Sequence, residues 1–149
     1  MRKLALSLAL MGMTLIASAQ DIQLPKPQFE NKVTLMEALQ NRHSSREYSE
    51  KQITDSELST VLWAACGINR PESGKLTVPS AINAQDIQVY VIRQDGAYLY
   101  QPKENTLKKV CGKDLRSLVA GRQTFAATTP VSLVLVSNHT KFGNLQKAA

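Results

Sequence analysis

The apolar residues of the chain first adopt a helical spacing between positions 34 and 41. Thr34 and Glu37 have the spacing of a capping box, in which each side chain accepts a hydrogen bond from the other residue's backbone N–H. An apolar stripe follows, made of Leu35, Met36 and Leu39. The pattern therefore predicts a short helix that ends near Asn41.

A second capping box, at Thr54 and Glu57, opens a longer helical pattern. Its apolar residues recur at spacings of three and four, at Leu58, Val61, Leu62 and Ala65. Gly67 fits the C′ position that ends such a helix, so the sequence predicts a helix over residues 55–66. Trp63 lies off the stripe; we expect it to be partly buried against a neighbouring element, with a contact to a partner chain as the alternative.

The second half of the chain alternates short apolar runs with turn residues, which is typical of antiparallel strands. Asp95-Gly96 is a strong hairpin signal. The predicted elements are a polar loop at 69–79, strands at 87–93, 97–100 and 107–110, and a partly helical stretch at 112–127 with apolar Leu115, Leu118 and Val119. The uninterrupted apolar run Val131–Val136 predicts a central strand buried on both faces.

The N-terminus has the pattern of a secretory signal peptide over residues 1–19. Arg2 and Lys3 precede an apolar run from Leu4 to Ala17, and small residues of the A-x-A type lead to a cleavage site after Ala19. A membrane span needs about 20 apolar residues, so a stable membrane anchor is the weaker alternative. We expect export to the periplasm or the extracellular space. Residues 20–32 contain two prolines and predict an exposed, extended lead-in.

Composition limits the classes of function. The chain has 149 residues, a one-domain length, and a formal net charge of +6. The lysines are spread without a Lys/Arg block or interleaved aromatic residues, which disfavours nucleic-acid binding. His43 and His139 lack further ligands at metal-binding spacing, so no metal site is expected. The sequence leaves open whether Cys66 and Cys111 pair.

Arginines, a histidine and serines are concentrated between positions 42 and 46. The guanidinium fork suits phosphate, and in an extended backbone Arg42, Ser44 and Arg46 share one face. The segment is therefore a plausible clamp for a phosphate monoester. The alternative is a solvated basic turn between two helices.

The Arg-His-Ser-Ser-Arg run is followed about forty residues later by a second characteristic segment. Pro79-Ser80-Ala81-Ile82-Asn83-Ala84-Gln85 leads into the apolar run that begins at Ile87. The two segments together, in this order, resemble the flavin-dependent nitroreductase superfamily over roughly residues 33–140. The resemblance implies an α+β fold in which helices flank a mostly antiparallel sheet.

The resemblance also implies an FMN site. In that family the first segment binds the FMN phosphate, which assigns Arg42, Ser44 and Arg46 to the phosphate and His43 to the ring side. Asn83 is expected to contact the flavin ring, with Ser80 and Gln85 supporting its loop. No catalytic side chain is predicted, because the flavin carries the redox chemistry itself.

The implied activity is two-electron transfer, as hydride, between a reductant and a small oxidised molecule such as a nitroaromatic or a quinone. The family fold is a homodimer, and its members generally run past this length. We therefore expect residues 33–149 to be an incomplete domain, truncated on its C-terminal side, that exposes apolar surface, is marginally stable alone and binds FMN weakly or not at all. Two alternatives stay open: a non-catalytic, exported ligand-binding module of the same fold, and a basic surface-binding protein.

Overall fold

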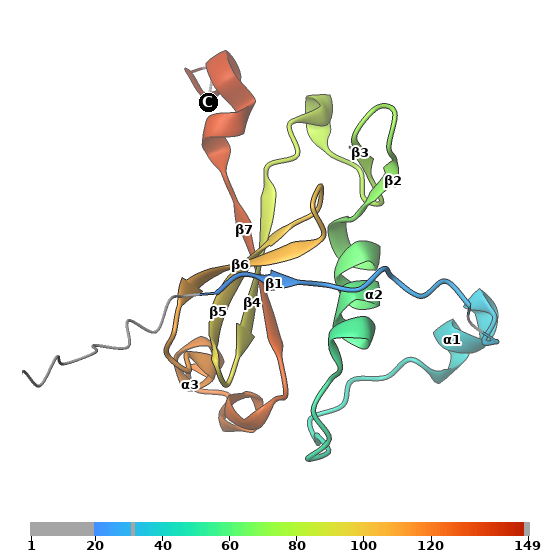
Figure 1. The fold of residues 1–149 in the computed structure, drawn as a ribbon, viewed down its shortest axis with the longest axis vertical. Helices are drawn as coiled ribbons and strands as arrows, with labels where there is room; N and C mark the ends of the chain where they lie inside the picture. Colours follow the sequence, from blue (N-terminus) through green and yellow to red (C-terminus); the bar gives the residue numbers. More distant parts are fainter. Residues whose placement is uncertain (1–19, 31, 148–149) are drawn as a thin grey trace, which may run out of the picture.

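The computed structural model describes residues 20–30 and 32–147 (Figure 1); the signal-peptide prediction lies outside these residues. The elements, in chain order, are β1 (Ile22–Gln23), α1 (Leu35–Asn41), α2 (Asp55–Cys66), β2 (Ile68–Arg70), β3 (Lys75–Leu76), η1 (Ala81–Asn83), β4 (Ile87–Arg93), β5 (Gly96–Gln101), β6 (Thr106–Cys111), α3 (Arg116–Ala120), η2 (Thr124–Thr128), β7 (Ser132–Ser137) and η3 (His139–Lys147), where η marks a 3-10 helix. None of the described helices is long and apolar enough to cross a membrane.

Local capping starts both predicted helices where the sequence places them. Thr34 Oγ1 accepts the Glu37 backbone N–H at 3.2 Å at the start of α1. At α2 the capping box is complete, because Thr54 Oγ1 accepts from the Glu57 N–H and Glu57 Oε2 accepts from the Thr54 N–H at 2.8 Å. This last hydrogen bond is the main reason why the pKa of the Glu57 carboxyl lies below its ordinary value.

The main sheet is antiparallel throughout, with the strand order β1-β6-β5-β4-β7. The hairpin of β4 and β5 closes at the pair Arg93 and Gly96, so the predicted Asp95-Gly96 turn is confirmed. Gly96 has φ +148° and its position faces the Cys111 carbonyl oxygen, which would lie 2.4 Å from an added Cβ. The architecture confirms the expected α+β fold with helices beside an antiparallel sheet.

The hydrophobic core lies between α2 and one face of this sheet (Figure 1). Leu58 and Leu62 of α2 are fully buried, and burial of such a side chain is worth about 1.5–3 kcal/mol. The other core side chains are Leu24, Cys66, Val89, Val91, Tyr98, Tyr100 and Leu107. Asn105 connects three parts of this core, since its Nδ2 donates to the Pro25 carbonyl and to Ser59 Oγ and its Oδ1 accepts from Tyr100 Oη.

Two predictions about the first half need correction. The lead-in is not merely exposed, because β1 pairs with β6 and Leu24 is 3% exposed in the core. Gly67 does not end α2 in a left-handed conformation; it is the C-cap, with φ −73° and ψ 161°. A glycine is needed there for space, since an added Cβ would lie 2.4 Å from Cδ1 of Trp63.

The apolar stripe of α2 is also rotated from the predicted one. Val61 is exposed, whereas Ser59 and Cys66 join Leu58 and Leu62 on the buried face. Trp63 is partly buried, as expected: its ring meets that of Phe29 edge-on at 4.6 Å between centroids.

The largest differences concern the C-terminal half and the loop after α2. The run Val131–Val136 is predicted to form a central strand, but among the described strands β7 pairs only with β4 and forms one edge of the sheet, with Leu135 63% exposed. The stretch 112–127 is partly helical, as predicted, with α3 and most of η2, but Leu118 and Val119 are exposed. The predicted loop 69–79 contains the β2–β3 hairpin.

Candidate functional site

Helix α1 ends at Asn41 and delivers the chain directly to Arg42 in extended backbone, with φ −66° and ψ 120°. All residues from Arg42 to Arg46 are exposed and lie outside helices and strands. Among the described residues, the side chains of Arg42 and Ser44 make no hydrogen bond or ion pair. Their donors are therefore free to bind an anion from solution, which fits the phosphate of FMN.

His43 and Arg46 are positioned by neighbouring groups. The Nδ1 atom of His43 lies 2.9 Å from the Asn41 carbonyl oxygen. A carbonyl only accepts, so Nδ1 carries the proton and Nε2 remains available to a ligand. The guanidinium of Arg46 lies over the Phe125 ring of η2, 5.7 Å from its centroid, which holds this end of the segment against η2.

The second predicted segment, from Ser80 to Gln85, has strained backbone. Ile82, Asn83 and Gln85 all have positive φ values, of 49°, 58° and 48°. Such a conformation costs a non-glycine residue on the order of 1–3 kcal/mol, and it is unusual for a β-branched side chain such as Ile82. Strain of this kind persists only where other contacts fix the backbone, and it is concentrated at ligand-binding loops.

The contacts that fix this loop come first from its own predicted residues. Ser80 Oγ accepts the Gln85 backbone N–H at 2.6 Å, and Gln85 Nε2 donates to Asn83 Oδ1 at 3.3 Å. The structure thus brings Ser80, Asn83 and Gln85 together in one loop.

The end of the loop is held by the chain that follows β7. The Asn138 N–H donates to the Asp86 carbonyl oxygen at 2.8 Å, and Ser137 Oγ donates to the Asp86 carboxylate. Lys141 Nζ donates to the Gln85 carbonyl oxygen at 2.7 Å. Sequence reasoning missed these supporting residues, because they lie more than fifty positions away and carry no motif.

The two predicted segments do not meet within one chain. In Figure 1 the segment after α1 leads to the start of α2, whereas the η1 loop lies beyond its other end. Among the described residues, no hydrogen bond or ion pair joins Arg42, His43, Ser44 or Arg46 to Ser80, Asn83 or Gln85.

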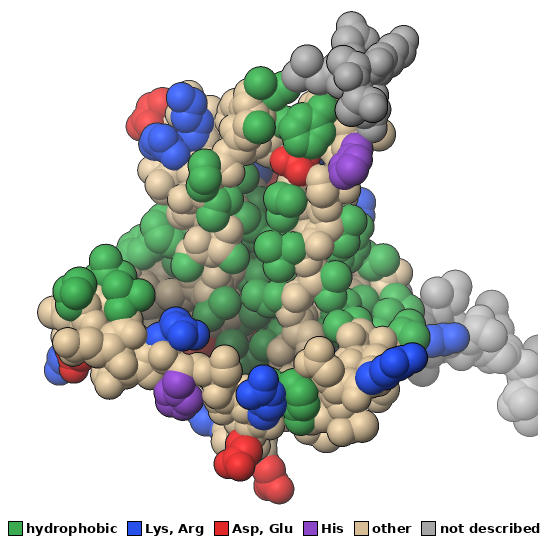
Figure 2. Space-filling model, turned by 180° about the vertical axis from the view of Figure 1, so that it is seen from behind, with side chains coloured by type: hydrophobic (Ala, Val, Ile, Leu, Met, Phe, Trp, Pro, Cys, Tyr) green, Lys and Arg blue, Asp and Glu red, His purple; other side chains and the backbone are tan. Residues whose placement is uncertain are grey.

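A groove of about 450 Å³ lies beside the first segment and is lined by Tyr48, Lys51, Gln52, Ile53, Glu57, Pro130 and Val131. Figure 2 shows a hollow on one face of the molecule, with hydrophobic side chains in its interior and basic side chains at its rim. The lining of the groove is partly apolar, which suits a planar ring, and its lysine, Lys51, forms an ion pair with Glu57 at 3.3 Å.

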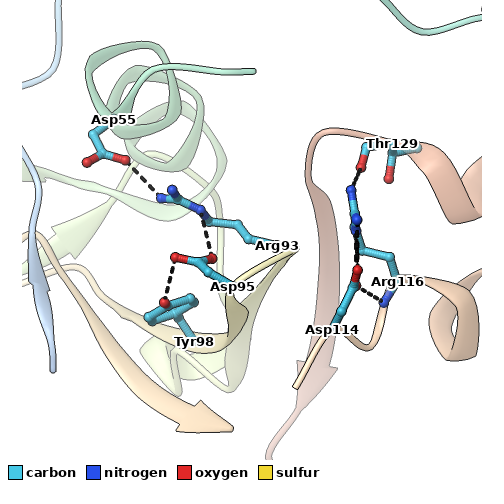
Figure 3. Close-up of polar contacts among 7 residues, drawn as sticks. All are labelled: Asp55, Arg93, Asp95, Tyr98, Asp114, Arg116 and Thr129. Atoms are coloured by element: carbon cyan, nitrogen blue, oxygen red, sulfur yellow. Dashed lines mark hydrogen bonds and ion pairs between the residues drawn. The ribbon is translucent and has the colours of Figure 1, made fainter. Parts of the chain in front are cut away.

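The polar networks away from these segments are structural. Arg93 bridges Asp55 at the start of α2, at 2.9 Å, and Asp95 in the hairpin, where Asp95 accepts from Tyr98 Oη at 3.0 Å (Figure 3). The same figure shows Arg116, which binds Asp114 at 2.7 Å and donates to the Thr129 carbonyl oxygen. These contacts connect α2 to the sheet and fix the turn around α3.

The two described cysteines do not form a disulfide. Cys66 and Cys111 are both free thiols. Burial raises the pKa of the Cys66 thiol to about 11, which disfavours the reactive thiolate. The described residues contain no group of His, Cys, Asp or Glu that could hold a metal ion.

Comparison with known proteins identifies the fold family. The model of the nitroreductase family matches residues 39–148, which is most of the chain and includes both predicted segments. The chain belongs to the nitroreductase family. The matched range includes Arg42 and Asn83, whose roles in binding FMN stay predictions.

Two individual relatives are also named as nitroreductases. The protein named "Putative nitroreductase MJ1384", from Methanocaldococcus jannaschii, is 31% identical over 133 residues, which are 83% of this chain and 65% of that protein. The crystal structure of a putative nitroreductase from Ralstonia eutropha superposes with a TM-score of 0.78 at 36% identity, covering 86% of this chain and 61% of that one. The chain thus spans somewhat less than two thirds of the length of both relatives.

Proposed function

We propose that this nitroreductase-family chain is part of an FMN-dependent oxidoreductase. The observation that carries the proposal is the loop of Ser80–Gln85, in which three non-glycine residues have left-handed backbone and which contacts on both sides hold in place. A folded protein keeps such strain where a ligand requires the geometry. The residues of this loop are the ones that the family resemblance assigns to the flavin ring.

The candidate side chains form two sets, one that would bind the FMN phosphate and one that would contact the flavin ring. Arg42 and Arg46 would bind the FMN phosphate with charge-assisted hydrogen bonds, and Ser44 would add a short donor. His43 would face the ring through its free Nε2. Asn83 would hydrogen-bond the ring edge, held in place by Gln85 and Ser80.

When bound, reduced flavin would supply two electrons as hydride to a small oxidised acceptor such as a nitroaromatic or a quinone. The protein's own residues would bind and orient the ring and exclude water from it. None of them needs to act as an acid, base or nucleophile in this scheme.

We also propose that the site is completed in a homodimer. The two segments of one chain lie toward opposite ends of α2 (Figure 1), so a second copy is needed to bring both kinds of contact to one flavin. The apolar side of α1 is available for such an interface, since Leu35, Met36 and Leu39 are 73%, 66% and 55% exposed. Sedimentation velocity with and without FMN tests this association.

A flavin titration tests the cofactor. Purified protein should bind FMN with a change in flavin fluorescence, and riboflavin, which lacks the phosphate, should bind more weakly. Arg42→Ala and Arg46→Ala should each weaken FMN binding by about 1.5–3 kcal/mol, roughly ten- to a hundredfold. Riboflavin binding should not change in either variant.

The matched control is Lys113→Ala, which removes one exposed positive charge from the turn after β6. It should leave the FMN affinity within about twofold, since a single exposed charge is largely screened by salt. Equal FMN affinity in the parent and both arginine variants would rule out the phosphate role. Absence of any flavin binding would favour the ligand-binding module without turnover.

Export remains a proposal that rests on residues 1–19. The basic start, the apolar run and the Ala17-Ser18-Ala19 site favour secretion and cleavage. Mass spectrometry of the exported fraction should find a mature chain that begins at Gln20. A chain that retains Met1 in a membrane pellet would contradict this.

A further inference from the structure

The β2–β3 hairpin places two cations beside the Ser80–Gln85 loop. Arg70 and Lys75 line a pocket of about 240 Å³ together with Ser80, Asn83 and Gln85. Its remaining wall is apolar and consists of Leu76, Val78 and Pro79. The hairpin was predicted only as a polar loop, so no role had been assigned to these cations.

Arg70 is held in a fixed position across the hairpin. Its Nη2 donates to the Leu76 carbonyl oxygen at 2.7 Å, and its Nε donates to Asn69 Oδ1 at 3.0 Å. A guanidinium has five N–H donors, so these two bonds leave others free, including both on Nη1. A positioned guanidinium loses less entropy when it binds an anion than a mobile one does.

No ion pair among the described residues neutralises the positive charge of this pocket. Arg70 and Lys75 take part in none of the ion pairs found among the described residues. The side chains that line the pocket also include no carboxylate. Two unpaired cations in one concave, partly apolar space favour an oxyanion attached to an organic body.

Gln85 connects this pocket to the predicted ring contact. Its Nε2 donates to the Gly74 carbonyl oxygen at the tip of the hairpin, at 2.9 Å, and to Asn83 Oδ1. The amide group thus fixes the hairpin relative to the loop. A molecule that lies against Asn83 would have the cations of the hairpin within reach of its far end.

We propose that the Arg70–Lys75 pocket binds the anionic group of the molecule that exchanges electrons with the flavin. This inference rests on the proposed function in one respect, namely that Asn83 faces the flavin ring. The ligand chemistry is an oxyanion on an organic body. It can belong to the carboxylate of an oxidised acceptor or to the phosphates of a nicotinamide dinucleotide donor, and the experiment separates these two sources.

The test uses Arg70→Met/Lys75→Met and a control, Lys108→Met/Lys113→Met, which removes the same charge from exposed positions in and just after β6. Reduced, FMN-loaded protein is mixed anaerobically with 4-nitrobenzoate or with neutral nitrobenzene, and flavin reoxidation is followed by absorbance. The hairpin variant should lose roughly five- to thirtyfold in its rate constant for 4-nitrobenzoate alone. A loss confined to flavin reduction by NADH would assign the pocket to the donor.

Unchanged rates for 4-nitrobenzoate and for NADH in the hairpin variant would overturn the proposal. So would weaker binding of FMN with unchanged binding of riboflavin in that variant, because the pocket would then hold the flavin's own phosphate. An equal loss in the control variant would likewise overturn it, since the effect would be one of net charge.

A flavin-free measurement separates this inference from the proposed function. Amide NMR of the parent protein titrated with 4-nitrobenzoate should show saturable shifts at Gly74 and Lys75, which disappear in the hairpin variant. Saturation at the hairpin in a protein that binds no FMN would support the anion pocket and contradict the flavin role. Unsaturable shifts at these residues would exclude the pocket.

Discussion

The strain in the Ser80–Gln85 loop predicts that glycine is more stable than alanine at position 82, the reverse of the order at an ordinary exposed site. Its backbone has φ 49° and its side chain is 68% exposed, so substitution there changes backbone energy more than it changes burial. The informative comparison is between Ile82→Ala and Ile82→Gly. Both variants lose the isoleucine side chain, and they differ chiefly in their tolerance of left-handed backbone.

The magnitude follows from two opposing terms. At an ordinary exposed site, glycine is less stable than alanine by roughly 0.5–1 kcal/mol, because the unfolded chain gains freedom. In left-handed backbone, alanine carries about 1–2 kcal/mol of steric strain that glycine avoids. At position 82 we therefore expect Ile82→Gly to be more stable than Ile82→Ala by about 0.5–1 kcal/mol.

Urea unfolding followed by circular dichroism measures this difference. Val61 provides the matched control, because it is also β-branched and 45% exposed but lies within helix α2. There Val61→Ala should be more stable than Val61→Gly by about 1 kcal/mol. If Ile82→Ala were more stable than Ile82→Gly by a similar margin, the backbone at position 82 would not be strained, and the main support for a ligand-binding loop would be lost.

Two further predictions concern the core around α2. Gly67→Ala should destabilise the fold by about 1–3 kcal/mol in the same urea assay, because the new Cβ would lie 2.4 Å from Cδ1 of Trp63. The control Gly112→Ala should unfold within about 0.5 kcal/mol of the parent, because the nearest contact of its new Cβ is 3.8 Å away. Burial raises the pKa of Cys66 to about 11 and that of Tyr100 to about 12, from 9.0 and 10.0. The unfolded chain therefore releases these protons first, and the free energy of unfolding should fall as the pH rises from about 9 to 12. Tyr100→Phe should make this fall shallower, and an unchanged slope would contradict the role of burial.

The elements that the sequence predicted well are those fixed by neighbouring residues. The capping residues Thr34 and Thr54 start their helices where expected, because an N-cap acts within a single turn. The strand at 87–93 has the predicted bounds, and its hairpin closes at Asp95-Gly96. Each of these features needs no information from distant parts of the chain.

The features that were missed depend on contacts between distant residues. Leu24 enters the core because Asn105, eighty-one positions later, accepts the Leu24 backbone N–H and donates from its side chain to the Leu24 carbonyl oxygen. The need for glycine at position 67 comes from the close approach of Trp63, since an added Cβ would lie 2.4 Å from its Cδ1 and 2.7 Å from its Cα, rather than from a helix-ending motif. No local pattern carries either fact.

The same distinction applies to the candidate site. The family resemblance selected Ser80, Asn83 and Gln85, and the structure brings these three together. The resemblance gave no indication of Lys141 of η3, which holds the loop, or of the hydrogen bond from Gln85 to Gly74. Motifs select the side chains that touch a ligand, whereas the supporting contacts depend on the tertiary fold.

Strand β7, whose position in the sheet was predicted wrongly, shows that an apolar run indicates burial rather than a central place in a sheet. Val131–Val136 was read as a central strand, yet β7 pairs only with β4, and Leu135 and Val136 are 63% and 40% exposed. An apolar run indicates that its residues are buried in the native assembly. That burial can come from another protein chain as well as from contacts among the described residues. Helix α1 leads to the same conclusion, since its residues form a regular capped helix and none of them is buried. Two separate elements with well-formed backbone and uncovered apolar side chains are the surfaces expected of a chain that associates with further protein, as the proposed dimer requires.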